Sequence, residues 1–397
     1  MATSLRNTGN GGERRVHTRP IRLGIIGCGA IVRAQHLPAI RSAGCFDLVA
    51  VADHSPEAAS DAVAAWLGIP IERQSSEHRR HPDVHNFLER RWWPDASGLL
   101  EASGVEAVLI ATPNNTHSTI ARACLAEGAH VFCEKPVAFT VEAHDALDRM
   151  ATEKGLTFQV GLVLRYSAVF RHLRTLVEES SPPLMMMISE FRPFPHMEWR
   201  FSRTVSGGVF IEKNCHHFDL FNWMLGDAVR PARVVTFGGQ AVLKDQPRDC
   251  WCLYEKKRLP ASEIPDHAWV LVEYENGVRA QLGLSFFCPW GREFRMSVLS
   301  EESKIDVYEM DRLIYVHKAP DKTQRFPPDP TGRAWQDEVG YHEEGAVHSG
   351  ATQQWVEFAD CIRTARRPWC DLTRARESIR LAVAAQRSLD EGRIVEV

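Results

Sequence analysis

Short apolar runs alternate with longer amphipathic stretches between residues 21 and 161. The short runs suit buried strands, and the longer stretches place apolar residues at helical spacing. Strands separated by helices predict a parallel sheet covered by helices on both faces. The expected strands are 21–26, 48–52, 105–112, 129–133 and 157–161, and the expected helices include 30–42, 116–127 and 141–154.

Residues 70–95 interrupt this alternation. The segment is rich in charged residues and histidine, and Trp92-Trp93-Pro94 lies near its end. We interpret it as a surface insertion. The two tryptophans are expected to cover an apolar patch rather than to bind a ligand, because such side chains contribute mainly through burial.

Strand-like patterns follow one another after residue 165, without helices between them. Glu275-Asn276-Gly277 separates two of these patterns, and Asn-Gly tolerates the positive φ angles of a tight hairpin turn. Consecutive strands predict an open, mainly antiparallel sheet in an α+β domain. The expected strands are 232–242, 268–274, 278–287, 294–299 and 304–308, and the expected final helices are 351–366 and 373–389, after a Pro-, Gly- and charge-rich excursion over 320–347.

The change of pattern divides the 397 residues into two domains, as the length alone suggests. The Gly-, Asn- and Arg-rich start, residues 1–20, is expected to be a disordered leader. We therefore predict an α/β fold. It combines a doubly wound parallel sheet over residues 21–161 with an α+β domain over residues 162–397 that includes the final helices.

Composition and charge argue against several classes of protein: nucleic-acid-binding, membrane-spanning and exported. The net charge of −4 gives no broad attraction to nucleic acid or to anionic membranes. No apolar stretch approaches the roughly 20 residues that cross a bilayer. Ten cysteines lie scattered along the chain, which favours reduced thiols. Arg14-Arg15 is not followed by the apolar segment of an export signal, so we expect a cytoplasmic protein.

Gly27-Cys28-Gly29 lies where the first expected strand gives way to a helix. Gly27 permits a tight turn, and Gly29 lets the backbone approach a pyrophosphate at the positive end of the helix. Asp53 ends the next strand, where a carboxylate accepts hydrogen bonds from a ribose. Val32 replaces the third glycine of the usual pattern. The combination predicts a dinucleotide site, and Asp53 favours NAD over NADP because it would repel a 2′-phosphate.

Three further motifs occur in order along the chain. Thr112-Pro113-Asn114-Asn115-Thr116-His117 follows one strand, and Glu134-Lys135-Pro136 follows the next. The third motif combines Gly207-Gly208, Glu212, His216 and Asp219. Together with the glycine turn, they resemble the Gfo/Idh/MocA family of glucose–fructose oxidoreductases and inositol dehydrogenases, over roughly residues 21–300.

This resemblance implies a Rossmann domain followed by an α/β domain whose open sheet forms a homo-oligomer interface. It also implies a cleft where nicotinamide meets a polyol, with Lys135 and His216 as catalytic residues. The family commonly carries Asp where this chain has Glu212, so the role of this carboxylate stays open. The expected cofactor contacts are Gly27, Gly29, Ala30, Ile31, Asp53, Thr112, Pro113, Asn114, His117, Glu134 and Lys135.

The residue types agree with hydride chemistry. Oxidation of an alcohol requires a base for the hydroxyl proton, and histidine suits this task because its ordinary pKa is near ~6.5. If residues 212–225 form one helix, Glu212 and His216 share a face of it. Lys135, at the edge of the parallel sheet where ligands bind, can polarise a carbonyl oxygen.

Structural roles compete with these assignments. Lys135 can be a solvated surface residue. A metal site is the alternative role of the cluster formed by Glu212, His216, His217 and Asp219. A carboxylate and a histidine four residues apart can share an ion, but no third ligand is assignable, so we expect no metal. His217 points away from His216 on a helix and is expected to hydrogen-bond locally. The candidates for the substrate cleft, which can equally be surface or packing residues, are Arg165, Tyr166, Arg192, Trp199, Arg200 and His217.

The function predicted from the sequence is a dehydrogenase or reductase that acts on a sugar, a sugar derivative or a cyclitol. The resemblance also allows a redox-neutral glycosidase or lyase that uses tightly held NAD. A third alternative is a non-catalytic, dinucleotide-sensing regulator on the same fold. The presence of both Lys135 and His216 argues against that last reading.

Overall fold

The computed structural model describes residues 19–71, 76–101, 104–195, 197–252, 255–318, 322–326 and 350–397. Nearly all of the predicted leader and most of the predicted excursion over 320–347 lie outside the described residues. Residues 322–326 of that excursion form a strand. No helix among the described residues is both long enough and apolar enough to cross a membrane.

The N-terminal half contains a six-stranded parallel sheet with the order β3-β2-β1-β4-β5-β6. This is the strand order of a Rossmann fold, so the predicted doubly wound sheet is confirmed. Its central strands are buried along almost their whole length, as strands covered on both faces should be. The strands are β1 (Ile21–Ile26), β2 (Phe46–Ala52), β3 (Trp92–Trp93), β4 (Ala107–Ile110), β5 (His130–Cys133) and β6 (Phe158–Val160).

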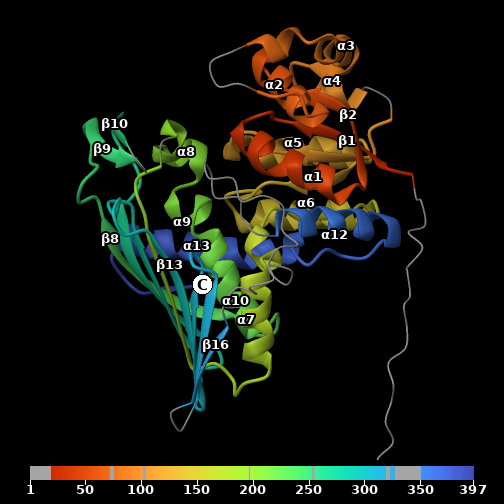
Figure 1. Ribbon diagram of the computed structural model, residues 1–397. Coiled ribbons are helices and arrows are strands. Elements are labelled where there is room, and N and C mark those ends of the chain that lie inside the picture. The colour runs from red at the N-terminus through yellow and green to blue at the C-terminus, as the bar shows by residue number, and fades with distance from the viewer. Residues whose placement is uncertain are drawn as a thin grey trace, which may run out of the picture.

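Helices connect these strands and cover the sheet (Figure 1). Two of them begin at side-chain caps: Ser55 Oγ accepts from the Ala58 amide, and Thr140 Oγ1 accepts from the Ala143 amide. The helical elements are η1 (Val32–His36), α1 (Leu37–Ala43), α2 (Pro56–Leu67), η2 (Glu77–Arg80), α3 (Pro82–Arg91), α4 (Ala96–Glu101), η3 (Asn114–Thr116), α5 (His117–Ala126) and α6 (Val141–Glu153).

The interpretation of residues 70–95 as an insertion is wrong for their second part. Helix α3 leads into β3, which pairs in parallel with β2 through Val51 and Trp92. The indole nitrogen of Trp92 donates a hydrogen bond to the carbonyl of Asp53. The segment thus builds the edge of the sheet beside the expected ribose site. A strand of two residues is too short to show a periodic pattern.

The C-terminal half contains a nine-stranded mixed sheet with the order β16-β15-β14-β13-β7-β12-β11-β8-β17. All of its strand pairs are antiparallel except β7 with β12. The predicted hairpin joins β11 to β12, and Gly277 has a φ of +87° there. The strands are β7 (Met185–Phe191), β8 (Pro231–Gly239), β11 (His267–Tyr274), β12 (Arg279–Ser285), β13 (Glu293–Leu299), β14 (Ser303–Tyr308), β15 (Leu313–Lys318), β16 (Lys322–Phe326) and β17 (Val395–Glu396), with a separate hairpin of β9 (Arg248–Cys252) and β10 (Glu255–Leu259).

One face of this sheet is covered by helices. Figure 1 shows α7, α10 and α13 along the side that faces the N-terminal domain. The remaining helical elements are η4 (Val163–Tyr166), α7 (Ala168–Glu178), η5 (Glu198–Phe201), α8 (Arg203–Ser206), α9 (Val209–Glu212), α10 (Cys215–Leu225), α12 (Ala351–Thr364) and α13 (Leu372–Glu391).

Two expectations about helices need correction. The predicted helix over 212–225 is broken, because α9 ends at Glu212 and α10 begins at Cys215. Helix α12, assigned by the sequence to the second domain, packs against α1 instead. Its Trp355 is fully buried and stacks on Phe132 of β5, with ring centroids 4.4 Å apart. The C-terminal segment therefore completes the core of the N-terminal domain.

Candidate active site

The turn after β1 depends on two glycines with different surroundings. Gly27 has a φ of +89°, and a Cβ on it would lie 2.7 Å from the carbonyl carbon and oxygen of Ala111. Only glycine allows the ends of β1 and β4 to approach so closely. Gly29, in contrast, is exposed, and no protein atom lies within 4 Å of where its Cβ would be. This open backbone at the start of a helix is what a pyrophosphate requires.

Asp53 connects the end of β2 to this turn. Its Oδ2 accepts a hydrogen bond from the Cys28 amide at 2.7 Å, and its Oδ1 accepts one from the Ser55 amide at 2.8 Å. Each carboxylate oxygen can accept further hydrogen bonds, so the side chain is fixed and still suited to a ribose. Ala30 and Ile31 are exposed where the helix begins.

The helix expected over 30–42 is present and begins at Ala30, but it contains the π-helical segment η1 before it continues as α1. The Leu37 amide donates to the Val32 carbonyl, five residues back, and such wide turns occur often at functional sites. Here the turn carries His36 into the core. Trp355 Nε1 donates to His36 Nδ1 at 3.2 Å, so Nε2 holds the proton and faces Glu134 Oε1 at 2.8 Å.

The carboxylate of Glu134 accepts a hydrogen bond from His36 and a second one, at 3.2 Å, from the backbone amide of Lys135. A Cβ on Gly161 would lie 2.9 Å from its Oε1, so this glycine leaves room for the carboxylate. Burial alone would raise the pKa of Glu134, but the hydrogen bond from His36 and the charge of the Lys135 ammonium lower it. Glu134 is therefore a fixed anion at the end of β5.

The motif at residues 112–117 forms a turn beside this anion. His117 is 1% exposed, and its ring nitrogens each lie 2.8 Å from a backbone oxygen, of Thr112 and of Pro136. Asn114 is also buried and donates to the Ser206 carbonyl of α8 at 3.0 Å. Both side chains hold chain segments together, which differs from the predicted direct contact with a cofactor. Thr112 and the exposed Pro113 stay at the surface of the turn.

Lys135 reaches from the N-terminal domain to α9. Its Nζ donates to the Glu212 carbonyl at 2.6 Å and lies 3.2 Å from Glu212 Oε1. Burial alone would lower the pKa of Lys135, but the Glu212 carboxylate outweighs it and the pKa is raised. Lys135 is therefore an ammonium ion at neutral pH. The fold thus brings together Lys135 and Glu212, two of the site residues predicted from the sequence.

Glu212 is shared between two cations. Arg200 Nη2 lies 3.3 Å from the same Oε1 that meets Lys135. Burial alone would raise the pKa of Glu212, but Arg200 and Lys135 hold it at about 2. A carboxylate with so low a pKa is a poor proton acceptor near neutral pH. Its role here is to hold cations in place.

The two histidines of α10 differ in surroundings. His216 is the second residue of the helix and is 5% exposed. His217 is fully buried, with Nε2 3.1 Å from Glu190 Oε2 and Nδ1 2.9 Å from the Asn214 amide nitrogen. Burial lowers the pKa of His217. The expected local hydrogen bonding of His217 is therefore confirmed, whereas it does not line the pocket described next.

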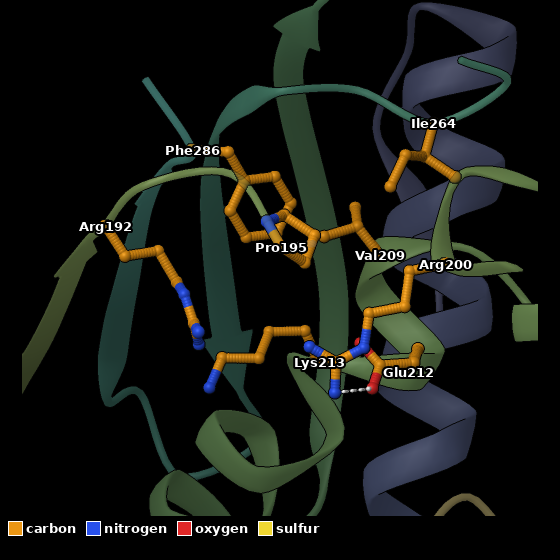
Figure 2. Close-up of a pocket in the computed structure, with 8 residues that line it drawn as sticks. All are labelled: Arg192, Pro195, Arg200, Val209, Glu212, Lys213, Ile264 and Phe286. Atoms are coloured by element: carbon orange, nitrogen blue, oxygen red, sulfur yellow. Dashed lines mark ion pairs between the residues drawn. The ribbon is translucent and has the colours of Figure 1, made fainter. Parts of the chain in front are cut away.

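A narrow pocket adjoins Glu212. Figure 2 shows Arg192, Arg200 and Lys213 turned toward one space, with apolar side chains around them. The guanidinium of Arg200 also lies 5.4 Å from the ring centre of Trp199 in η5. The lining residues are Arg192, Pro195, Arg200, Val209, Glu212, Lys213, Ile264 and Phe286.

Two family models match the chain in succession. The NAD-binding Rossmann domain of the GFO_IDH_MocA oxidoreductase family matches residues 21–162, and the C-terminal alpha/beta domain of the same family matches residues 183–397. The chain belongs to the Gfo/Idh/MocA family. The family resemblance predicted from the sequence is thereby confirmed.

Relatives of this Gfo/Idh/MocA protein are known by name. It is 22% identical to the scyllo-inositol 2-dehydrogenase (NAD(+)) of Bacillus subtilis, over 83% of this chain and 87% of that protein. It is 26% identical to an inositol 2-dehydrogenase of Ralstonia nicotianae, over 71% and 72%. An inositol dehydrogenase homolog from Azotobacter vinelandii, solved with NAD+, superposes with a TM-score of 0.72 at 20% identity, over 96% and 98%. At that identity the superposition shows the shared fold.

Two residues of this Gfo/Idh/MocA chain that the sequence suggested for the substrate cleft, Arg165 and Tyr166, are buried and bonded to other parts of the protein. Arg165 is 3% exposed and binds Asp219 through two hydrogen bonds of 2.8 and 2.7 Å. Tyr166 is fully buried, donates a hydrogen bond to Glu357 and stacks on Trp369. Their polar groups face buried carboxylates, and neither residue lines the pocket beside Glu212.

Two residues of this Gfo/Idh/MocA site were missed by the sequence reasoning: His36 and Lys213. Lys213 directly follows Glu212 within the third motif, so its position alone could have suggested it. Arg192, a predicted candidate for the substrate cleft, does line the pocket and directly follows β7, a strand that the sequence pattern did not reveal. His36 gave no signal, because its partners Glu134 and Trp355 lie far away in sequence.

Proposed function

We propose that this Gfo/Idh/MocA protein transfers a hydride between NAD and a hydroxyl or keto carbon of a sugar, a sugar derivative or a cyclitol. The observation that carries the proposal is the Lys135 ammonium at the carboxyl edge of the Rossmann sheet, held by Glu212, which also lines a pocket of the C-terminal domain. Ligands of doubly wound folds bind at this edge. The activities for which the inositol dehydrogenase relatives are named point to the same class of substrate.

The residues of the N-terminal domain fit NAD. The open backbone at Gly29 would receive the pyrophosphate, and Asp53 would accept from the adenosine ribose. The remaining parts of the NAD molecule would be bordered by Ala30, Ile31 and Thr112 and by the strand-end residues Glu134 and Lys135. NAD supplies the hydride acceptor or donor. The carboxylate of Asp53 disfavours NADP.

The protein side chains would manage the proton and the oxygen of the substrate. Lys135 would donate a hydrogen bond to that oxygen and stabilise its negative charge as the C–H bond breaks. Glu212 would keep Lys135 in place. Because the pKa of Glu212 is about 2, we assign the proton acceptor to His216.

The experiment is a screen of sugars and cyclitols with NAD, followed by the absorbance of NADH. Net NADH formation supports the dehydrogenase. Substrate conversion without net NADH formation would favour the redox-neutral glycosidase or lyase. NADH binding without any conversion across the panel would favour the regulator.

We propose a homo-oligomer that forms through the uncovered face of the C-terminal sheet. Phe237 (68% exposed), Trp269 (49%) and Leu271 (47%) project from β8 and β11 on that face, and Phe237 pairs directly with Trp269. Contiguous exposed apolar residues mark protein interfaces. The variant Trp269→Asp should shift the mass in light scattering toward the monomer, and an unchanged mass would count against this face.

We also propose a cytoplasmic location. All ten cysteines are free thiols in the structure, and reduced cysteines suit a reducing compartment. Cell fractionation with an antibody against the chain tests this, and recovery in an extracytoplasmic fraction would overturn it.

A further inference from the structure

The pocket beside Glu212 carries more positive than negative charge. Arg192, Arg200 and Lys213 line it with Glu212 as the only carboxylate among its lining residues. Lys135 adds a fourth cation through Glu212, and Glu190 adds a second carboxylate behind Arg192 and Lys213. Glu134 lies beside Lys135 and Glu309 lies near Lys213, so the excess belongs to the lining itself, where three cations face one carboxylate. An excess of this kind in a partly buried site favours a ligand of the opposite sign.

Glu190 fixes two of these cations in one place. Its Oε1 lies 2.9 Å from Lys213 Nζ and 3.3 Å from Arg192 Nη1, while its other oxygen faces His217. The break between α9 and α10 places Lys213 here, and the end of β7 places Arg192. Figure 2 shows both cationic ends on the side of the pocket away from Glu212.

Two arginines of the pocket also have hydrogen-bond donors that are not used within the protein. The Nε atoms of Arg192 and Arg200 are buried and donate no hydrogen bond to any described residue. Buried donors in native proteins almost always have partners, so these atoms indicate a missing acceptor. The apolar side chains of Pro195, Val209 and Phe286 border the same space, and they strengthen the attraction between opposite charges there.

We propose that the substrate is an anionic sugar or cyclitol whose oxyanion, a carboxylate or a phosphate, binds Arg192 and Lys213 while its reacting carbon lies beside Lys135. The inference rests on the proposed function and narrows it. A guanidinium binds an oxyanion through two parallel hydrogen bonds, and an ammonium adds a point charge. Arg200 and Lys135 stay paired with Glu212, and they would contact the uncharged part of the substrate.

The test compares matched probes that differ in charge: D-glucuronate and glucose 6-phosphate against D-glucose, with myo-inositol as a neutral cyclitol. Binding to the NADH-loaded protein is measured by calorimetry, and kcat/KM with NAD is measured for any probe that turns over. We expect at least one anionic probe to bind at least about tenfold more tightly than glucose. The more effective anion distinguishes a carboxylate from a phosphate ligand.

The variant Arg192→Gln should remove this preference, with about a tenfold or greater loss for the anionic probe and little change for the neutral ones. Arg258→Gln serves as the matched control, because Arg258 is an exposed residue of β10 outside the pocket. Anionic probes that bind no better than glucose, or a preference that survives in Arg192→Gln, would overturn the inference. Turnover of neutral probes would then leave the dehydrogenase assignment standing.

A pH series gives a second readout. Burial lowers the pKa of Lys213 to about 8, so its ammonium is present below that pH and is lost above it. The affinity for the anionic probe should fall above pH 8 in the wild type. Lys213→Arg should remove this fall, because a guanidinium stays charged; a fall that persists would exclude Lys213 as a ligand. The groups facing Lys213 are Glu190, Arg192, Lys135, Glu212 and Glu309, with Arg292 and Arg312 beside Glu309.

Discussion

Replacing Gly27 or Gly29 by alanine adds one methyl group in each case, but the two variants should affect different properties. Gly27→Ala should lower stability, and Gly29→Ala should weaken the binding of NADH. In Gly27→Ala the new Cβ must enter space 2.7 Å from the Ala111 carbonyl, at a φ of +89°. A left-handed conformation costs an L-residue about 1–2 kcal/mol, and overpacking costs about 1–3 kcal/mol more. The sum is about 2–5 kcal/mol, which corresponds to a fall in Tm of roughly 4–20 °C for a domain of this size.

In Gly29→Ala the new Cβ meets no protein atom within 4 Å. Surface substitutions of this kind usually change stability by about 0.5 kcal/mol or less, so the Tm should stay within about 2 °C. The methyl group would instead occupy the space into which the pyrophosphate comes. We expect the Kd for NADH to rise at least about tenfold, equivalent to ~1.4 kcal/mol, and further in Gly29→Val.

Differential scanning fluorimetry and titration of NADH fluorescence measure the two effects separately. The Tm is read without cofactor, so that loss of binding does not contribute to it. An unchanged Kd in both Gly29 variants would refute the assignment of the turn to the pyrophosphate. A Tm for Gly27→Ala equal to that of the wild type would refute the close approach of β1 and β4.

Lys135→Ala and His216→Ala should each lower kcat by about 10²–10⁴-fold while the Kd for NADH stays within about twofold; activity retained by both would refute the proposed chemistry. Asp53→Ser with His54→Arg should shift preference toward NADP, because His54 is 95% exposed at its side chain and can be replaced without disturbing the helix cap; equal kcat/KM ratios before and after would contradict the ribose assignment. Arg165→Leu leaves a buried carboxylate unpaired and should lower stability by about 3–5 kcal/mol, as denaturant unfolding would measure; an unchanged midpoint would show that the ion pair is not structural.

The elements that the sequence revealed are those with a strong local signal. The buried strands of the Rossmann sheet are continuous apolar runs, and the Asn276-Gly277 hairpin has a turn that few other dipeptides make. Strand β7 was missed although it lies at the centre of the second sheet. Its buried positions alternate, but one of them is Glu190. A carboxylate in a core strand hides the pattern, and such local conflicts tend to occur at functional sites.

The site was predictable only as far as its motifs extend. Lys135 and Glu212 belong to ordered motifs, and the fold brings them together. The two possible roles of Arg165 and Tyr166 could not be separated from the sequence, because a polar side chain next to a cleft has the same appearance there whether it meets a ligand or a buried carboxylate. The partners that decide this lie 54 and 191 residues away along the chain. No local pattern records a pairing at that distance.

The position of α12 has a consequence for synthesis on the ribosome. Trp355 covers Phe132 and holds the tautomer of His36, yet it follows Gly161, the end of the predicted first domain, by 194 residues. At about 5–20 residues per second, translation of that interval takes roughly 10–40 s. Through this time the N-terminal sheet exposes the apolar surface that α12 later buries. The nascent chain therefore depends on a segment made long after the sheet, or on a chaperone, to close the core that will hold NAD.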